Sequence, residues 1–361
     1  MSPRASVLVA MSGGVDSSVA ACLLHEQGFE VLGSHMNLVH LDGVEHGCCG
    51  PRARADAAGV ARIAGFPFEI VDMSETFDRT VLADFLDEHE AGRTPNPCVR
   101  CNERIKFGAF LDRADDLGFD FVATGHYVRN VRNVETPHGR WLLRGADRSK
   151  DQSYVLHMLG QRELSRSLFP VGEMQKGETR AEAERLGLPV ARKPDSQEVC
   201  FVPGADHAAF IEERRPELAR TGEFVDPTGK TIGTHQGSFR YTIGQRRGLG
   251  ISTGSREYVV DVDRSTNRVV VGPQELLGRR ALEADRLSWV AGGPPASGAF
   301  EADAQVRSSG DAVPSVVRAS EDGSVTVEFK AAQRGIAPGQ SVVLYRGDEL
   351  LGGGRIRAAV R

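Results

Sequence analysis

The sequence predicts an α/β protein, with a doubly wound parallel-sheet domain followed by two smaller, mainly β domains. In the first third of the chain, short apolar, β-branched runs alternate with segments of helical spacing, which is typical of parallel βαβ units. From about residue 221, short β-branched runs recur between Gly, Asn and Asp turns, which is typical of hairpins. We therefore expect domains over residues 1–205, 206–281 and 282–361.

The α/β half begins with a strand over residues 6–11. The segment 16–28 then has helical spacing, with Val19, Leu23 and Leu24 as its apolar stripe. The same alternation continues along the chain. It predicts further strands at residues 30–38, 68–72 and 119–124, and helices at residues 52–65 and 107–118.

In the second half, strands are predicted where a β-branched run ends at a turn. Asp322-Gly323 and Gly347-Asp348 have the composition of hairpin turns. The Gly- and Pro-rich segment 292–298 separates two sets of such runs. The strands expected from these runs are residues 257–262, 268–271, 324–329 and 341–345.

Composition places the chain among ordinary globular proteins. Of its 361 residues 40% are hydrophobic and 26% charged, which excludes disordered, collagen-like and coiled-coil classes. No apolar run approaches the roughly 20 residues of a membrane span, and the first residues do not have the pattern of a signal peptide. We expect a soluble, cytoplasmic protein with no membrane partner. The formal net charge of −5 does not fit a general nucleic-acid coat.

The chain has six cysteines, which in a reducing cytoplasm are more often redox, metal-binding or catalytic groups than structural disulfides. Cys22 lies on the apolar stripe of the first predicted helix, so we expect it in the core. Cys48 and Cys49 sit in a Gly-bounded loop, where they could bind metal or sulfur or be an incidental pair.

Residues 12–18 (Ser-Gly-Gly-Val-Asp-Ser-Ser) lie between the first strand and the first helix. Two glycines let the backbone approach a ligand, and the helix start presents N–H groups to an anion. The serine hydroxyls add donors, and Asp16 can hold Mg²⁺. The loop is suited to a pyrophosphate, although a capped strand-to-helix turn would also have Gly and Ser here. It lacks the Gly-Lys-Ser/Thr of the usual P-loop.

A second motif spans residues 94–107 (Thr-Pro-Asn-Pro-Cys-Val-Arg-Cys-Asn-Glu-Arg-Ile-Lys-Phe). Pro95 and Pro97 restrict the backbone to extended conformations, so we expect Cys98 to be exposed at a tip just before a helix. A Cys-x-x-Cys pair by itself is equally consistent with a redox or metal clip.

Charge and spacing favour a reactive thiol here. Arg100 and Arg104 flank the pair, and cations near a helix N-terminus favour the thiolate form. Such a pair needs a further partner, and the third candidate thiol is Cys200, in the segment 195–201 (Asp-Ser-Gln-Glu-Val-Cys-Phe).

The loop at residues 12–18 resembles the pyrophosphatase loop of the ATP-pyrophosphatase (PP-loop) superfamily, whose members split ATP between the α and β phosphates and activate a carbonyl oxygen as an adenylate. With the two cysteine motifs, the chain resembles the bacterial tRNA-specific 2-thiouridylase family over essentially its whole length. Supporting segments are residues 123–127, 150–154, 239–249 and 338–340.

The resemblance implies an adenine nucleotide hydrolase-like PP-loop first domain and a C-terminal β-barrel that contacts tRNA. It implies ATP-dependent thiolation of C2 of the wobble uridine in the tRNAs for Lys, Glu and Gln. It implies a persulfide on Cys200, a nucleophilic Cys101 and a Cys101–Cys200 disulfide, with Asp16 also in the catalytic set and ATP and Mg²⁺ as cofactors. The implied ATP site is Ala10, Met11, Ser12, Gly13, Gly14, Val15, Asp16, Ser17, Met36 and Gly125. The implied tRNA contacts are Asn96, Pro97 and Cys98 at the target base, with His126, Lys150, Asp151, Gln152 and Gln340.

Two departures from the family pattern bear on mechanism. The family often has an acid where this chain has Cys98, and a protonated thiol is a poor general base. The residues before Cys200 are Gln-Glu-Val rather than the commoner Thr-Gly-Ile. An alternative is therefore an iron–sulfur cluster held by Cys98, Cys101 and Cys200, with sulfur carried on an open iron.

Two other classes use fewer of these residues. A nitrogen-transferring ligase of the same superfamily would have no use for the thiol motifs. A non-catalytic tRNA-binding protein would leave the ATP loop unexplained.

Two kinds of partner follow from the family reading. A cysteine desulfurase or sulfur-carrier protein must supply sulfur. For the phosphates of tRNA the candidate contacts are Arg140, Arg144, Arg148, Lys150, Arg240, Arg246 and Arg247.

Overall fold

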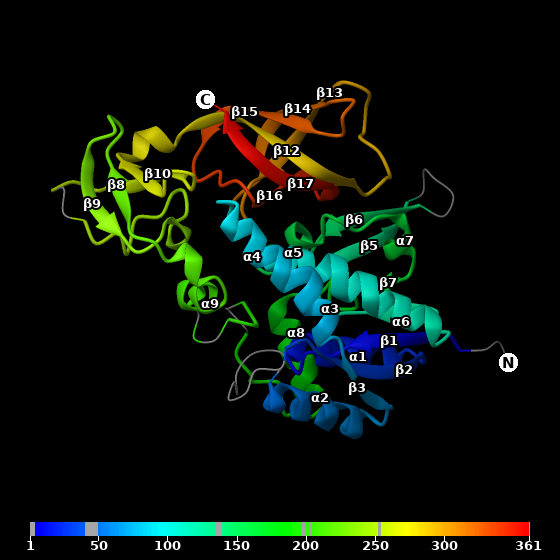
Figure 1. Cartoon of the computed structure of the whole chain (residues 1–361). Helices are drawn as coiled ribbons and strands as arrows, with labels where there is room; N and C mark the ends of the chain where they lie inside the picture. Colours follow the sequence, from blue (N-terminus) through cyan, green and yellow to red (C-terminus); the bar gives the residue numbers. More distant parts are fainter. Residues whose placement is uncertain are drawn as a thin grey trace.

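The structure is a computed structural model, shown in Figure 1. It describes residues 4–39, 50–133, 139–195, 199–202, 204, 206–251 and 254–360. Within these residues the strands form a five-stranded, a four-stranded and an eight-stranded sheet. The predicted fold class, a parallel-sheet domain followed by two mainly β units, is confirmed.

The first sheet is parallel throughout, in the order β3-β2-β1-β4-β7. The chain runs outward from the central β1 on one side and then returns to the other side, so the strand order reverses between β1 and β4. In open α/β sheets, ligands bind at the carboxyl ends of the strands at this reversal. The strands are β1 (Ser6–Ala10), β2 (Glu30–Asn37), β3 (Phe68–Asp72), β4 (Phe121–Ala123) and β7 (Ser167–Leu168).

Both faces of this sheet are covered, because alternate side chains of β1 enter different cores. Val7 and Val9 pack with the first group of helices, and Leu8 and Ala10 with a second group on the other face. The first group is α1 (Val15–Glu26), α2 (Pro51–Ala64) and α8 (Lys176–Arg185).

The second group forms two long helical runs, each interrupted by a π-helical segment. One run is α3 (Ser74–Phe77), η1 (Asp78–Leu82) and α4 (Ala83–Glu90), and the other is α5 (Pro97–Cys101), η2 (Asn102–Ala109) and α6 (Phe110–Asp116). The predicted helix start at residue 107 is wrong, because this helix begins at Pro97. Bonds of the i→i+5 type in η2 disturb the 3.6-residue period on which the prediction depended.

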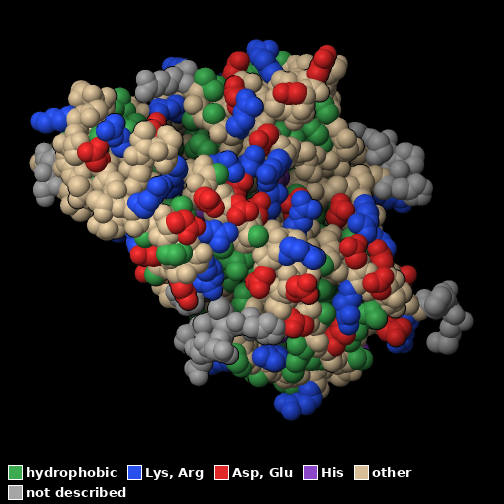
Figure 2. All heavy atoms as spheres, in the orientation of Figure 1, with side chains coloured by type: hydrophobic (Ala, Val, Ile, Leu, Met, Phe, Trp, Pro, Cys, Tyr) green, Lys and Arg blue, Asp and Glu red, His purple; other side chains and the backbone are tan. Residues whose placement is uncertain are grey.

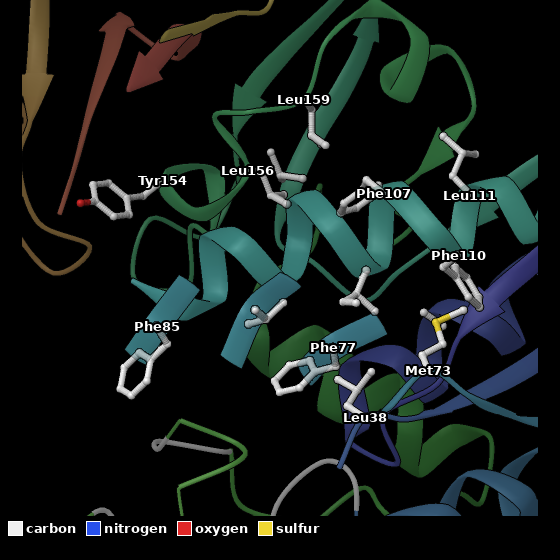
Figure 3. Packing of buried hydrophobic residues seen from close by; sticks show 14 of the residues in the cluster. Leu38, Met73, Phe77, Phe85, Phe107, Phe110, Leu111, Tyr154, Leu156 and Leu159 are labelled. Carbon is white, nitrogen blue, oxygen red and sulfur yellow. The ribbon is translucent and has the colours of Figure 1, made fainter. Parts of the chain in front are cut away.

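Large apolar side chains fill the space between these helices and the sheet. Phe77, Phe107, Phe110 and Leu111 belong to one buried cluster, together with Tyr154, Leu156 and Leu159 of the following segment. In Figure 3, Leu156 and Leu159 lie near Phe107, and the Tyr154 ring points away from them. Short helices in that segment are η3 (Ser153–Leu156) and α7 (Gln161–Ser165).

One hairpin of the first half joins the last sheet, which the sequence did not indicate. Strands β5 (Val128–Arg132) and β6 (Arg140–Arg144) pair with each other, and β6 pairs with the C-terminal strand β17 (Glu349–Val360) through Leu143 and Glu349. The hairpin therefore extends the C-terminal sheet to eight strands.

The central part contains a four-stranded sheet around Phe224, Val259, Val269 and Val271. Its order is β10-β11-β8-β9. The strands are β8 (Gly222–Val225), β9 (Thr231–His235), β10 (Tyr258–Asp263) and β11 (Arg268–Gly272); the helical segments are α9 (His207–Arg214), η5 (Pro216–Leu218), η6 (Ser238–Arg240) and η7 (Gln274–Leu277).

The C-terminal part is a closed barrel, because its first strand pairs with both β15 and β17. Its strands are β12 (Arg279–Trp289), β13 (Ala299–Gln305), β14 (Val313–Ala319), β15 (Val325–Gln333) and β16 (Ser341–Arg346), closed by β17. Gly323 and Gly347 have positive φ between paired antiparallel strands, so both predicted hairpin turns are confirmed.

A buried ion-pair group connects the barrel to α4. Arg355 of β17 binds Asp285 with two nitrogens and donates to Glu88 of α4 at 2.7 Å. Glu88 also accepts from Arg93, and burial of such an acid is tolerated only when it is paired. In the part of the chain that the structure describes, no helix combines the length and apolar character of a bilayer span.

Replacing Phe110 by Ala tests the packing of α6. Phe110 is 0% exposed, so Phe110→Ala should lower the free energy of unfolding by about 3–5 kcal/mol. Leu117→Ala, at a side chain 47% exposed just after the same helix, should change it by less than about 0.5 kcal/mol. Urea unfolding measures both, and equal losses would show that this side of the sheet is not a packed core.

Candidate active site

A cavity of about 620 Å³ lies where the strand order of the parallel sheet reverses. The loop after β1, the loop after β4 and the start of α5 contribute to its wall, together with residues 199–201. Most of the predicted site residues line it: Ala10, Met11, Ser12, Gly14, Val15, Asp16, Ser17, Met36, Pro97, Cys98, Cys101, Gly125, His126, Lys150, Asp151, Gln152 and Cys200. Gly13 lies within the same loop, whereas Asn96 lines a different cleft.

Glycine is required at two points around the loop of residues 12–18, because neighbouring backbone comes too close for a side chain. Gly13 has φ +71°, and a Cβ there would lie 2.1 Å from the carbonyl oxygen of Ala53. A Cβ on Gly125 would lie 2.5 Å from the amide nitrogen of Ser17. The loop after β4 is thus pressed against the first turn of α1, which closes one wall of the cavity.

Serine hydroxyls stabilise the loop from within. The Ser12 amide donates to Ser17 Oγ at 3.2 Å, and Ser18 Oγ donates to the carbonyl of Gly14 at 2.8 Å. These bonds hold the turn that leads into α1, whose positive end favours an anion.

Beside the loop lies a network of lysines and carboxylates. Lys176, at the start of α8, donates to both carboxylate oxygens of Asp16 at 2.7 and 2.8 Å and also pairs with Asp195 at 2.9 Å. Lys150 and Arg180 also bind Asp195. Burial alone would raise the pKa of Asp195, but hydrogen bonds from Lys150 and Lys176 outweigh it and lower this pKa to about 2.

Other contacts complete the network around the loop. Tyr127 OH donates to Asp16 at 2.8 Å, and burial raises the pKa of this phenol. Lys193 donates to the carbonyl of Gly13 and to Asp56. Sequence reasoning missed Lys176, Arg180 and Lys193, which are distant in sequence from the loop and carry no local motif.

The two thiols of the Cys-x-x-Cys pair share a helix face. Asn96 caps α5 by accepting from the amide of Cys98 at 3.1 Å, and Pro97 occupies the first helical position, where its missing N–H has no cost. The prediction that Cys98 precedes the helix is wrong, because it lies in the first turn. Residues three apart on a helix are neighbours, so Cys98, which is exposed, and Cys101, which is half-buried, both line the cavity.

Arg100 and Arg104, which were predicted to favour the thiolate form of this pair, do not line the cavity with the thiols. Both arginines line a second cleft, of about 750 Å³, with Asn96 at its edge. Arg100 pairs there with Glu103 and Asp84. Figure 2 shows basic and acidic side chains together over the middle of one face, between the barrel and the sheet domain.

Cys200 reaches the cavity because the next residue is anchored in the core. Phe201 is 2% exposed and packs against the rings of Phe77, Phe85 and Phe210 at centroid distances of 5.3 to 5.5 Å. Residues 196–198 of this motif, and Cys48 and Cys49, lie outside the described residues. Cys22 is buried as predicted, and burial raises its pKa to about 11.

Several residues predicted to contact tRNA also hold the site together. Asp151 accepts from Arg144, Ser153 and the amide of Gly145. Gln152 accepts from the amide of Tyr127 at 2.9 Å.

Two further residues predicted to contact tRNA, His126 and Gln340, also make contacts within the protein. His126 is buried, and burial and then nearby Lys106 lower its pKa well below the usual value. Gln340, from the barrel, donates to the carbonyl of Thr94 at 2.8 Å and so fixes the segment that precedes α5.

The candidate phosphate-binding arginines differ in availability. Arg144 lies over the ring of Tyr345 at 3.5 Å, Arg148 pairs with Asp348, and Arg240 pairs with Glu212. Arg140 lies in β6. Arg246 and Arg247 are both exposed.

The donor groups of the cavity fit Mg²⁺ better than an iron–sulfur cluster. Mg²⁺ needs only one or two carboxylates besides phosphate oxygens and water, which Asp16 and Asp195 can offer. Over the described parts of the chain, no group of three or more His, Cys, Asp or Glu side chains has the arrangement of a metal site, and this includes Cys98, Cys101 and Cys200.

Comparisons with known proteins cover nearly the whole chain. Family profiles described as a tRNA methyl transferase HUP domain, a tRNA methyl transferase PRC-barrel domain and an aminomethyltransferase beta-barrel domain match residues 5–204, 208–273 and 279–356. The tRNA-specific 2-thiouridylase MnmA of Roseiflexus sp. (strain RS-1) is 46% identical in an alignment that covers 98% of this chain and 99% of that protein. Proteins of the same name from Carboxydothermus hydrogenoformans and Acidothermus cellulolyticus are each 47% identical, over 98% of this chain and 98% and 99% of theirs.

Gly13→Ala tests the close approach in the loop. The free energy of unfolding of the variant should fall by about 1–3 kcal/mol, because the new Cβ clashes with the backbone of Ala53. The variant should also bind ATP more weakly, because the loop has to move. Gly28→Ala is the matched control, since Gly28 also has positive φ but a Cβ there would meet no described atom within 4 Å. The control should be destabilised yet bind ATP normally in calorimetry. If Gly13→Ala binds ATP normally, the loop is not part of the ATP site.

Proposed function

Since the chain belongs to the tRNA-specific 2-thiouridylase family, an ATP-dependent group of tRNA sulfurtransferases, we propose that it thiolates C2 of the wobble uridine in the tRNAs for Lys, Glu and Gln. The observation that carries the proposal is that the phosphate loop, Cys101 and Cys200 line a single cavity. In this proposal residues 1–205 bind ATP and carry the chemistry, and residues 282–361 contact tRNA.

The first step activates the carbonyl. The C2 oxygen of uridine is a poor leaving group, and attack of this oxygen on the α-phosphate of ATP converts it into an adenylate and releases pyrophosphate. In this proposal the amides at the start of α1 and the ammonium of Lys176, which lies beside Asp16, stabilise the phosphates. Asp16 and Asp195 would hold Mg²⁺, which neutralises charge on the phosphates when bound.

The second step transfers sulfur. In one route a persulfide on Cys200 attacks C2 and expels AMP, and the Cys101 thiolate then attacks Cys200 Sγ, leaving sulfur on C2 and a Cys101–Cys200 disulfide. In the other route Cys101 attacks the persulfide first and releases hydrosulfide, which attacks C2. Both routes consume one persulfide sulfur and end in the same disulfide, which a dithiol must reduce.

Most of the proposed tRNA contacts lie around the cavity, and Asn96 lies next to it, on the cleft at the other side of α5. Asn96, Pro97 and Cys98 stand at the start of α5, where an unstacked anticodon base would enter. His126, Lys150, Asp151 and Gln152 line the cavity. Gln340 does not line it, but it donates to the carbonyl of Thr94, in the segment that leads into α5. A cysteine desulfurase, acting directly or through a carrier protein, would load Cys200.

The iron–sulfur alternative uses the same cysteines and makes a different prediction. It requires a visible absorbance band in protein purified without oxygen, and this band should disappear in Cys98→Ala. A colourless protein that forms 2-thiouridine would leave only the persulfide route.

Cys101→Ser tests the chemistry directly. The full-length protein is incubated without oxygen with unmodified tRNA, ATP, Mg²⁺ and a persulfide source, and 2-thiouridine is measured by mass spectrometry of digested tRNA. The variant should lose thiolation by more than about 1,000-fold, because both proposed routes end in a Cys101–Cys200 disulfide that it cannot form. If wild-type protein shows no tRNA-dependent cleavage of ATP, the proposed function is wrong.

Lys176→Met tests the adenylation half separately. Removing the ammonium beside Asp16 should slow tRNA-dependent release of AMP by about 100- to 1,000-fold, the usual cost of one group that stabilises developing charge. Lys330→Met, which removes an exposed lysine paired with Glu301 on the barrel, serves as control. Equal AMP release by the two variants would contradict the role of Lys176.

A further inference from the structure

Three cysteine thiols line the cavity, and the proposed reaction uses two of them. Cys98, Cys101 and Cys200 all line it, but sulfur transfer needs only Cys101 and Cys200. Cys98 differs from the other two in being exposed, whereas they are half-buried. It is therefore the thiol among the three that a large reductant reaches most easily.

Cys98 and Cys101 are close enough to form a disulfide with a small adjustment. Positions three apart on a helix have Cβ atoms about 5–6 Å apart, whereas a disulfide needs about 3.5–4.5 Å. The adjustment falls in the first turn of α5, whose N-terminus is held by the Asn96 cap and by Gln340 through Thr94. Directly after Cys101 the helix changes to the π-helical segment η2, so Cys101 stands at a junction between two helical geometries.

On the basis of the proposed function, we propose that Cys98 is a catalytic resolving thiol. After sulfur transfer, the Cys98 thiolate attacks Cys101 Sγ of the Cys101–Cys200 disulfide, so that a Cys98–Cys101 bond forms and Cys200 leaves as a thiolate. This exchange is redox-neutral, and the proton of Cys98 is lost to solvent before the attack. A dithiol protein then reduces the Cys98–Cys101 disulfide with two electrons and is itself oxidised to a disulfide.

The exchange separates the reloading of Cys200 with sulfur from the reduction of the disulfide. Cys200 becomes available for a new persulfide sulfur as soon as the exchange is complete. The remaining disulfide includes the exposed Cys98, so once the tRNA has left, the reductant need not reach the half-buried Cys200 or the ATP end of the cavity. Without Cys98, the reductant has to reach a disulfide between two half-buried residues.

The test compares the first turnover with later turnovers in wild type and Cys98→Ser. Full-length protein is loaded by a cysteine desulfurase with L-cysteine and given tRNA, ATP and Mg²⁺. Each protein is its own reference, since the readout is the ratio of the steady rate to the first-turnover rate. With thioredoxin as reductant this ratio should fall at least tenfold in Cys98→Ser, and with dithiothreitol, which is small enough to enter the cavity, the loss should be much smaller.

Disulfide mapping gives a second readout that does not depend on rates. After one turnover without reductant, thiols are blocked with N-ethylmaleimide and peptides are analysed by mass spectrometry. Wild type should contain the Cys98–Cys101 peptide pair, and Cys98→Ser should accumulate Cys101–Cys200.

Two results would overturn the resolving role while leaving the proposed function intact. One is 2-thiouridine formation by wild type with no disulfide that contains Cys98. The other is an unchanged turnover ratio in Cys98→Ser with thioredoxin. If wild type forms no 2-thiouridine in the first turnover, the proposed function itself fails.

Discussion

The helical run from Pro97 to Asp116 is the element on which the site depends. Its buried side chains, among them Phe107 and Phe110, fix it against the parallel sheet, and its first turn carries Cys98 and Cys101. The C-terminal part of the chain fixes the segment just before this run. The Thr94 amide donates to the carbonyl of Pro338 at 2.7 Å, and Gln340 donates to the carbonyl of Thr94. The position of the thiols is therefore set jointly by the first and last parts of the chain.

The same helical run separates the cavity from the second cleft, and different charged side chains line the two. One side of it faces the cavity with the thiols, and Arg100 and Arg104 line the cleft on the other side, where acidic residues pair with Arg100. The cations that line the cavity are lysines: Lys106 of the same run, and Lys150, Lys176 and Lys193, which pair with carboxylates beside the loop 12–18.

Local pattern predicted the elements whose period is regular. The strands at β1, β2 and β3 and the helices α1 and α2 agree with the expected segments within a few residues, because each shows a clear period and ends at a turn residue or a cap. Helix α5 with η2 was missed, because π-type bonding does not have the 3.6-residue period. The pairing of β6 with β17 was missed, since it joins residues about 200 positions apart in sequence.

The sequence by itself determined the residues on which the proposed chemistry rests, because such loops and thiol motifs depend on residue types at fixed short spacings. Residues 12–18, Cys98, Cys101 and Cys200 were all identified in this way. Only the tertiary structure decided which groups surround them. The pairing of Lys176 with Asp16 and the turn of Arg100 away from the thiols depend on how distant segments pack, and no local pattern encodes such contacts.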